Sequence, residues 1–325
     1  MMPTTSLFPI ALVLRARLPL LAAALLLATS LNAVAQVPTA SDASDASDHA
    51  GLTGTAGTAD FGGKLLLTGG VSQIEGSAGG GLTPWAVIGG YGTASQVGGN
   101  AHATYVQTQD FAISSYGAEI GIANRVELSI AHQQLNTRAA GAALGLGTDY
   151  RINMDTFGIK VRVLGDAILD QDTWVPQIAV GMQYKHNNNG ALVKALGARS
   201  DSGTDFYVSA TKLLLAQSLL LNGTLRMTKA NQFGILGFGG DKSNAYKAAF
   251  EASAAYLLAK SVAVGVEYRM KPNNLGFARE QDAYDAFVAW APTKHFSFTL
   301  AYVDLGDIAT FRRQRGVYGS AQVGF

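Results

Sequence analysis

The feature that most constrains the fold is a repeated alternation of apolar and polar residues over segments of about ten residues. In "NRVELSIA", Val126, Leu128 and Ile130 fall on one face, whereas Glu127 and Ser129 fall on the other. The same alternation recurs in "MDTFGIKVRV", "TWVPQIAVGMQYKH", "NAYKAAFEASAAYL", "SVAVGVEYRM" and "HFSFTLAYV". A period of two residues is that of a β-strand with two different faces.

The links between these segments alternate in length. Short links fall near residues 123–124, 216–217, 260–261 and 292–293, and longer ones near 135–153, 187–201, 231–243, 273–280 and 305–314. Aromatic residues stand near the ends of the apolar faces, as in membrane-interface girdles; these are Trp174, Tyr184, Tyr246, Tyr256, Tyr268, Trp290 and Tyr302. We therefore predict an all-β fold, a transmembrane antiparallel up-and-down β-barrel of 12 strands from His102 to Phe325. Two further strands within residues 63–92 would make 14.

The composition supports this class and excludes others. Charged residues make up 14% of the chain and hydrophobic residues 48%, yet no apolar run of 18 or more follows residue 35. There is no cysteine, so disulfides and thiolate chemistry are excluded. Without the first 35 residues, the chain has 22 basic and 23 acidic residues. This balance does not predict a nucleic-acid partner.

The first 35 residues predict a secretory signal peptide. Arg15 and Arg17 precede the apolar stretch "LPLLAAALLLA", and Ala33-Val34-Ala35 is typical of a cleavage site. The apolar stretch is short for a membrane span. We expect cleavage near Ala35 and a disordered periplasmic tail over residues 36–60, because its residues are small and polar and its sequence is repetitive.

A glycine-rich stretch, residues 61–93, separates this tail from the predicted barrel, residues 94–325. It is predicted to be either a plug in or against the lumen or a first hairpin. Gly69–Gly81 is expected at the lumen mouth, with Glu75 near cations such as Arg162 or Arg226, and Trp85–Tyr91 in the wall or at its periplasmic rim. The candidate plug residues are Glu75, Gly69, Gly70, Gly79, Gly80 and Trp85.

Strand parity also predicts which charged side chains face the lumen, since charges on a lipid-facing surface are costly. The predicted lumen charges are Glu119, Glu127, Lys160, Arg162, Lys185, Arg226, Lys247, Glu251, Glu267, Arg269 and Asp285. They would either brace the wall as a paired ladder or set the field of a small aqueous pore.

The last strand, "RGVYGSAQVGF", places Phe325 in register with outward-facing residues. An aromatic C-terminus resembles the signal by which the barrel assembly machinery of the outer membrane recognises its clients. Outer-membrane lipids and this machinery are therefore the expected partners.

Two long stretches resemble a known family. They are "GKLLLTGGVSQIEGSAGGGLTPWAVIGGYGT", residues 63–93, and "SYGAEIGIANRVELSIAHQQLNT", residues 115–137. They resemble Gram-negative outer-membrane proteins grouped only as a domain of unknown function. The resemblance implies an outer-membrane barrel over most of the mature chain, and it implies no catalytic residue.

No catalytic, metal or cofactor motif stands out. The glycine stretch has no Gly-Lys-Ser/Thr triplet and no helix pattern follows it, so nucleotide binding is not expected. No G-x-S-x-G motif accompanies the isolated histidines. We expect no enzyme activity, no metal and no cofactor.

The main functional hypothesis is a porin-like passive channel, or a binding site for small solutes, with a mixed-charge lumen. One alternative is a non-conducting structural or envelope-assembly barrel plugged by residues 63–92. Another is a barrel for uptake of hydrophobic substrates, for which inward-facing Leu220, Leu257 and Phe287 are the cue.

Overall fold

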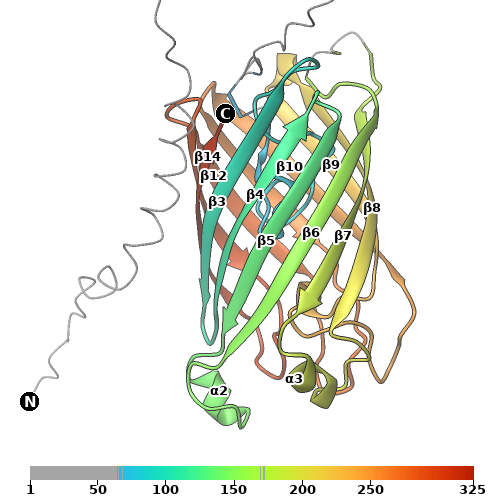
Figure 1. Ribbon diagram of the computed structural model, residues 1–325. Helices are drawn as coiled ribbons and strands as arrows, with labels where there is room; N and C mark the ends of the chain where they lie inside the picture. Colours follow the sequence, from blue (N-terminus) through green and yellow to red (C-terminus); the bar gives the residue numbers. More distant parts are fainter. Residues whose placement is uncertain (1–63, 65, 68, 169, 171–172) are drawn as a thin grey trace, which may run out of the picture. The chain divides into compact units, whose positions relative to one another are not determined.

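The computed structural model describes residues 64, 66–67, 69–168, 170 and 173–325. Over these residues the chain forms a closed antiparallel β-barrel of twelve strands (Figure 1), which confirms the predicted fold class. Each strand pairs with its neighbours in sequence, and β14 closes the barrel by pairing with β3. The predicted signal peptide and the tail over residues 36–60 lie outside the described residues.

The strand bounds are β3 (Val97–Thr108), β4 (Ala112–Ile122), β5 (Val126–Asn136), β6 (Arg151–Leu164), β7 (Gln177–Asn187), β8 (Ser202–Leu214), β9 (Leu219–Thr228), β10 (Lys247–Ala259), β11 (Val262–Arg269), β12 (Ala283–Trp290), β13 (Phe296–Asp304) and β14 (Arg315–Gly324).

The two ends of the barrel differ. The turn end carries the C-terminus and four short connections, one of which contains the helical turn η3 (Leu215–Gln217). The loop end carries longer connections that hold α2 (Ala140–Ala143), α3 (Gly190–Ala195) and η4 (Gln232–Gly234). Two connections break this rhythm, since residues 109–111 are short at the loop end and residues 165–176 are long at the turn end. Among the described residues, no helix has the length and apolarity needed to cross a membrane.

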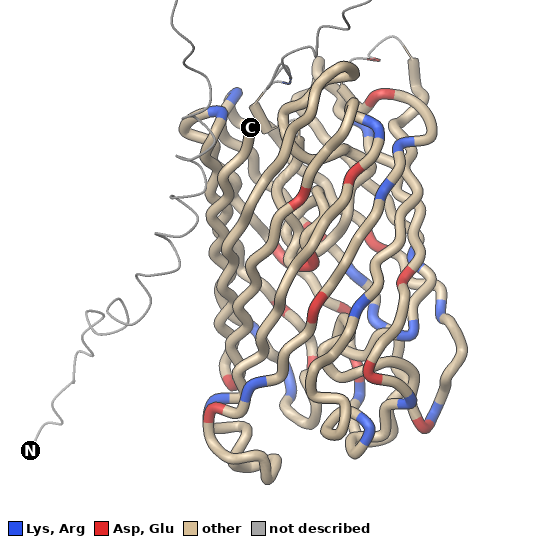
Figure 2. Tube along the Cα trace, in the orientation of Figure 1, with Lys and Arg blue, Asp and Glu red and all other residues tan. Residues whose placement is uncertain are grey.

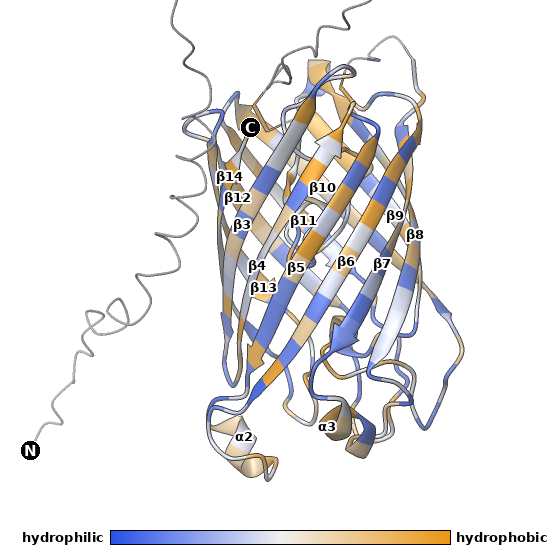
Figure 3. Cartoon of the chain, in the orientation of Figure 1, coloured by the Kyte–Doolittle hydropathy of each residue, from blue (hydrophilic) through white to orange (hydrophobic). Residues whose placement is uncertain are grey.

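The outer surface of the wall is apolar because the alternation in sequence follows the pleat of the strands. In β12, Tyr284, Val288 and Trp290 are exposed, whereas Asp285 and Phe287 are buried inside. Figure 3 shows the resulting bands of apolar residues along the strands. An apolar exterior around a polar interior is the surface of a barrel that lies in lipid.

Aromatic side chains line up on the outer surface near both ends of the wall. Toward the loop end, the Tyr268 ring centroid lies 5.1 Å from that of Tyr284 and 6.4 Å from that of Phe250. At the turn end, the Trp290 and Phe298 centroids are 5.9 Å apart. These rows fit the girdles expected at two membrane interfaces. The prediction for Trp174 is wrong, because it lies before β7 rather than on the outward face of that strand.

The reason for that correction is local. Trp174 is 91% exposed, and Pro176 separates it from the first paired residue of β7, Gln177. A proline cannot donate to a ladder of backbone hydrogen bonds, so it marks the start of the strand.

The described part of the glycine-rich stretch lies inside the barrel and adds no strand to the wall. Its two short strands, β1 (Val71–Ser72) and β2 (Ala78–Gly79), pair with each other. The 14-strand alternative is therefore wrong. Its physical obstacle is the pairing of β14 with β3, which uses the two edges that an extra hairpin would need.

The apolar exterior predicts a depth-dependent cost for a charge. Ile130, in the middle of β5, is 54% exposed on the outer surface. Ile130→Arg should lower the free energy of unfolding in phospholipid vesicles by about 2–4 kcal/mol. Gln134→Arg, on the same face of β5 but near its loop end, should cost about 0–1 kcal/mol. Urea titration of the folded fraction measures both values, and equal costs would contradict a lipid-facing surface.

Candidate functional site

The candidate site is the interior of the barrel, where the chain folds back into its own lumen. We call residues 69–92 the lumen segment. Every residue from 71 to 92 is buried. The segment begins and ends at the turn end, because the Lys64 backbone N–H donates to the Tyr91 carbonyl at 2.9 Å, and the Tyr91 N–H donates to the Phe325 carbonyl at 2.9 Å. The segment is therefore a loop that enters and leaves by one mouth.

Glu75 is fully buried in the lumen segment and is bound by cations of the wall. The Lys185 Nζ donates to its Oε1 at 2.5 Å, and the Arg269 Nη2 donates to both its carboxylate oxygens at 3.0 Å. The Arg226 Nη1 lies 3.8 Å from Glu75 Oε2. Burying a carboxylate is costly unless it is paired and hydrogen-bonded, and this one is both.

Two wall carboxylates complete this cluster. Asp205 Oδ2 lies 2.7 Å from Lys185 Nζ and 3.3 Å from Arg226 Nη1. Glu251 Oε1 accepts from Arg226 Nε at 2.5 Å and lies 3.4 Å from Arg269 Nε. Three carboxylates thus meet three cations. Figure 2 shows such acidic and basic positions along the strands, within the height of the wall.

A second anchor lies between the lumen segment and strands β5 and β6. Glu127 and Lys160 form an ion pair of 2.9 Å and are both 1% exposed. Glu127 accepts from the backbone N–H groups of Ala78 and Gly89 at 3.1 and 2.9 Å. Lys160 donates to the carbonyls of Ala78 and Trp85 at 3.0 and 3.1 Å. The pair therefore satisfies backbone groups that have no strand partner.

A third anchor is the carboxylate of Glu267 on β11. It accepts from the Leu82 backbone N–H at 2.7 Å, the Thr83 hydroxyl at 2.6 Å and the Ser253 hydroxyl at 2.8 Å. The Trp85 indole N–H also donates to the Ser253 hydroxyl, at 2.9 Å. This anchor fixes the second half of the lumen segment against β10 and β11.

The glycines allow the segment to approach these carboxylates. A Cβ on Gly80 would lie 2.0 Å from Glu267 Oε1, and one on Gly89 would lie 2.1 Å from Glu119 Oε1. Both positions therefore need glycine. Gly69 and Gly70 lie next to Gly90 and Gly79, so backbone packs on backbone there.

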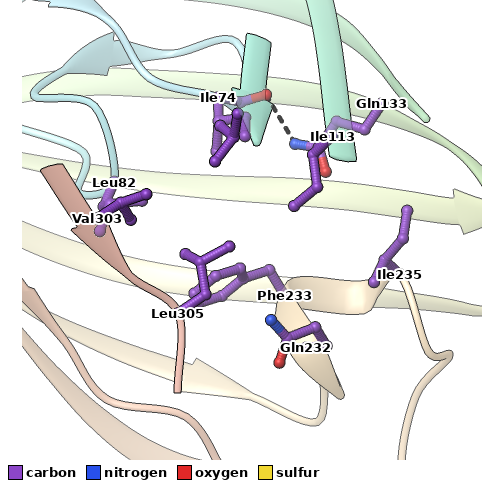
Figure 4. A pocket seen from close by; sticks show the side chains of 10 residues that line it. Ile74, Leu82, Ile113, Gln133, Gln232, Phe233, Ile235, Val303 and Leu305 are labelled. Carbon is purple, nitrogen blue, oxygen red and sulfur yellow. Dashed lines mark hydrogen bonds between the residues drawn. The ribbon is translucent and has the colours of Figure 1, made fainter. Parts of the chain in front are cut away.

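An apolar layer fills the lumen between the lumen segment and the loop end. Ile74 and Leu82 of the segment meet Val303 and Leu305, together with Phe233 of η4. Figure 4 shows these side chains around a cavity of about 20 Å³. This volume accommodates about one water molecule. The described residues thus fill the lumen at two levels, with the charges around Glu75 nearer the turn end and the apolar side chains nearer the loop end.

The predicted lumen charges fall into three groups. Most are buried inside the barrel and contact the lumen segment or each other. Lys247 does not lie buried in the lumen as predicted, because it is the first residue of β10 and is exposed at the rim of the loop end. Arg162 is not near Glu75, where it was predicted, because it lies at the turn end and pairs with Asp166 at 2.8 Å. Parity gives the side that a residue faces, but not its depth.

Glu119 and Phe325 lie near the turn end. Glu119 accepts from the Asn100 side-chain amide at 2.6 Å. Phe325 is 38% exposed, as expected for an outward-facing end of β14. Trp85–Tyr91 does not enter the wall, although Tyr91 reaches the rim that was the other predicted place.

Sequence reasoning missed several charged residues of the interior. Asp205 faces inward, because Phe206 and Val208, at positions of the opposite parity on β8, are exposed on the outer face. This alternation could have identified it. Lys271 and Glu280 lie in the connection between β11 and β12, where no period marks them.

Lys271 and Glu280 form a buried ion pair of 3.4 Å at the loop end. Burial lowers the pKa of Lys271 and raises the pKa of Glu280, in each case against the effect of the partner charge. The Lys271 ammonium also donates to the Gln232 side chain at 2.8 Å and to the Leu305 carbonyl at 2.6 Å. These bonds tie η4 to the neighbouring loops.

Two histidines, His132 and His102, lie apart from this interior cluster. His132 Nδ1 is 2.6 Å from Asp155 Oδ1 on the outer surface of β5 and β6. His102 is buried at the lumen side, with Nε2 3.4 Å from the Ser115 hydroxyl. The two therefore do not share one site.

The chain resembles several outer-membrane β-barrels of known structure at low sequence identity. The KdgM porin is 10% identical, over 70% of this chain and 99% of that one, with a TM-score of 0.45. The NanC porin is 12% identical, over 70% and 98%, with a TM-score of 0.46. Outer membrane phospholipase A from Escherichia coli is 11% identical, over 74% and 93%, with a TM-score of 0.38. At these scores the likenesses identify no function for this chain.

No curated protein matches the chain. A family model does match it, over residues 68–322, which include the whole lumen segment and nearly all of the wall. Because this match covers more than half of its length, the chain belongs to the family described as "Protein of unknown function (DUF3034)".

Proposed function

We propose that this protein is an outer-membrane channel for small solutes whose lumen segment acts as a plug, so that the described state is closed. The observation that carries the proposal is the burial of every residue from 71 to 92 inside a closed barrel, with both ends of the segment at one mouth. A loop that enters and leaves by one mouth can be withdrawn without threading the chain through the pore. The proposed channel uses no cofactor and catalyses no reaction.

The proposed location follows from the surface of the barrel and the N-terminal sequence. The apolar exterior and its aromatic rows fit a lipid bilayer. The predicted signal peptide would direct the chain out of the cytoplasm, and the aromatic C-terminus would engage the assembly machinery of the outer membrane. In this orientation the turn end faces the periplasm, and the lumen segment enters from that side.

The contacts of the lumen segment support a movable plug. The segment forms no ladder with any strand of the wall. It is held by wall side chains that donate to or accept from its backbone, and by the ion pairs of Glu75. Water can replace such partners when a lumen hydrates, because a hydrogen bond exchanged with water changes the free energy by only about 0.5–1.5 kcal/mol.

A non-conducting structural barrel is the second candidate. The observation that favours it is the apolar layer around Ile74 and Phe233, which closes the lumen a second time. The same layer would be the contact surface in a barrel for hydrophobic substrates. Its cavity of about 20 Å³ is too small for such a molecule unless the loops and the plug move.

Removal of the plug should open the pore. Purified full-length protein in planar lipid bilayers should give rare, brief conductance steps, whereas a variant without residues 64–92 should give large and lasting ones. The shift in gel mobility on heating checks that the shortened barrel is folded. A folded barrel without the segment that still gives no conductance would contradict the channel and favour the structural role.

Neutralising Glu75 should loosen the plug. Glu75→Gln removes one carboxylate partner from each of Lys185 and Arg269, which keep Asp205 and Glu251 nearby. Removing one partner of a buried pair costs about 3–5 kcal/mol. We expect a higher open probability in bilayers and a lower thermal midpoint. Asp149→Asn is the matched control, since Asp149 is exposed in a loop and asparagine tolerates its positive φ of 59°.

The double variant Glu75→Gln/Lys185→Met separates charge balance from lost contacts. It restores equal numbers of positive and negative charges in the cluster, so it should be more stable than Glu75→Gln alone. A double-mutant cycle on the thermal midpoint measures this coupling. Additive losses would show that the two side chains do not act as a pair.

A further inference from the structure

The guanidinium of Arg226 is satisfied by the wall of the barrel alone. It donates to both carboxylate oxygens of Glu251 and to the side chains of Gln183 and Asp205. Its contact with Glu75, at 3.8 Å, is the longest of the three contacts between that carboxylate and a cation. Arg226 therefore keeps its acceptors whether or not the lumen segment is in place.

The guanidinium of Arg269, in contrast, depends on the lumen segment. Among the described residues, its Nη1 donates only to the Leu82 carbonyl, at 2.9 Å, and its Nη2 only to the two carboxylate oxygens of Glu75. Its Nε faces a carboxylate of the wall, that of Glu251, at 3.4 Å. Withdrawal of the segment would therefore leave both Nη groups without acceptors.

Lys185 likewise divides its ammonium between the wall and the lumen segment. Its Nζ lies 2.7 Å from Asp205 Oδ2 and 2.5 Å from Glu75 Oε1. Without Glu75, three cations of the wall would face two carboxylates, which leaves one positive charge in excess. A guanidinium binds a carboxylate through two parallel hydrogen bonds, and an ammonium adds a third donor. The position of Glu75 thus matches one carboxylate in both charge and hydrogen bonding.

The apolar layer lies directly beside this position. The Phe233 ring is centred 4.2 Å from the Arg269 guanidinium, and the Phe233 carbonyl accepts from Lys185 at 3.2 Å. Val303 and Leu305 line the same layer (Figure 4) and belong to the barrel rather than to the lumen segment. The barrel therefore places an apolar surface next to a carboxylate-binding group.

Two neighbouring residues of the lumen segment occupy these two regions. Glu75 gives its carboxylate to the cations, and Ile74 places its side chain in the apolar layer (Figure 4). The segment thus presents one carboxylate and one adjacent apolar group to the inside of the barrel.

We propose that Arg269 and Lys185 form a binding site for a small organic acid with one carboxylate and an apolar body, and that Glu75 and Ile74 occupy this site in the closed state. The inference rests on the proposed channel, because a solute reaches the site only when the lumen segment withdraws. Such an acid would replace the segment in both its charge and its apolar contacts, so it would favour the open state. A neutral solute of the same shape would leave a buried positive charge without compensation.

Chemical rescue of a full-length variant tests the binding site without any measurement of conductance. Glu75→Ala removes the carboxylate and the methylene group attached to it, and acetate is their counterpart in solution. In detergent at neutral pH and constant sodium concentration, replacing chloride by acetate should raise the thermal midpoint of this variant. Acetamide should not raise it. Adding Arg269→Met to Glu75→Ala should remove the response to acetate.

The matched control is Glu267→Ala. Glu267 is also a buried carboxylate of the lumen, but it is held by the Leu82 N–H and the hydroxyls of Thr83 and Ser253 instead of by cations. Its loss should lower the thermal midpoint, and acetate should not restore it.

The apolar part of the site is tested with the full-length variant Ile74→Ala/Glu75→Ala. Butyrate has two more methylene groups than acetate, so isothermal titration should show about tenfold tighter binding of butyrate to this variant. Equal affinities would show that the site recognises a carboxylate alone and would contradict the apolar body.

The carboxylate site is disproved if acetate does not stabilise Glu75→Ala, or if acetamide stabilises it equally. The same holds if acetate stabilises Glu267→Ala as well, since its effect is then general. If Glu75→Ala does not fold by itself, its refolding yield in acetate against acetamide gives the same comparison, read from the shift in gel mobility on heating.

The role of the acid in opening is tested in planar bilayers. Butyrate should raise the open probability of the wild type above its value in chloride. If butyrate has no effect although removal of residues 64–92 opens the pore, the acid does not open the channel, and the channel itself stands. If that removal gives no conductance although acetate rescues Glu75→Ala, the channel fails, and with it the route of the acid to the site.

Discussion

The structure depends on the pairing of charges around Glu75. Five consecutive strands, β7 to β11, each contribute one charge to this level of the lumen, and the signs alternate around the wall. The charges belong in order to Lys185, Asp205, Arg226, Glu251 and Arg269. This arc alone has one positive charge in excess. Glu75 of the lumen segment supplies the missing negative charge, so the wall and the segment are electrostatically incomplete without each other.

Hydrogen bonding makes the backbone of the lumen segment depend on the wall in a similar way. Some of its N–H and carbonyl groups bond to each other within the segment, and side chains of the wall satisfy others. The Pro84 carbonyl accepts from Ser209, Asn222 and Thr224, and the Ala86 N–H donates to Thr211. Irregular backbone is tolerated at membrane depth only where it is satisfied in this way. Any withdrawal of the segment must therefore admit water to the lumen, because these wall groups would otherwise remain buried without partners.

The wall could be predicted from the sequence, whereas the depth and pairing of its charges could not. Alternation of period two gives the face on which Lys185, Arg226 and Glu251 lie, and the glycines with Glu75 indicate a segment within the lumen. The partners of Glu75 depend on strand register and tilt, which bring Arg269 close and leave Arg162 at the turn end. Lys247 shows the same limit, since its parity is inward although its place at the start of β10 exposes it. Lys271 and Glu280 lie in a loop without any period.

The charged cluster around Glu75 and the apolar layer around Phe233 share side chains, so they are not independent. Lys185, which binds Glu75, also donates to the Phe233 carbonyl at 3.2 Å. The guanidinium of Arg269 lies 4.2 Å from the centre of the Phe233 ring, in a cation–π contact. Gln232 and Phe233 both have positive φ, 44° and 61°, a conformation that costs about 1–3 kcal/mol per residue and persists only when the surroundings stabilise it. Departure of Glu75 would free Lys185 and Arg269 to reorient, and the strained turn of η4 would lose part of what holds it. In the proposed channel, opening from the turn end would therefore be coupled, through Lys185 and Arg269, to the loop around Phe233 at the opposite end.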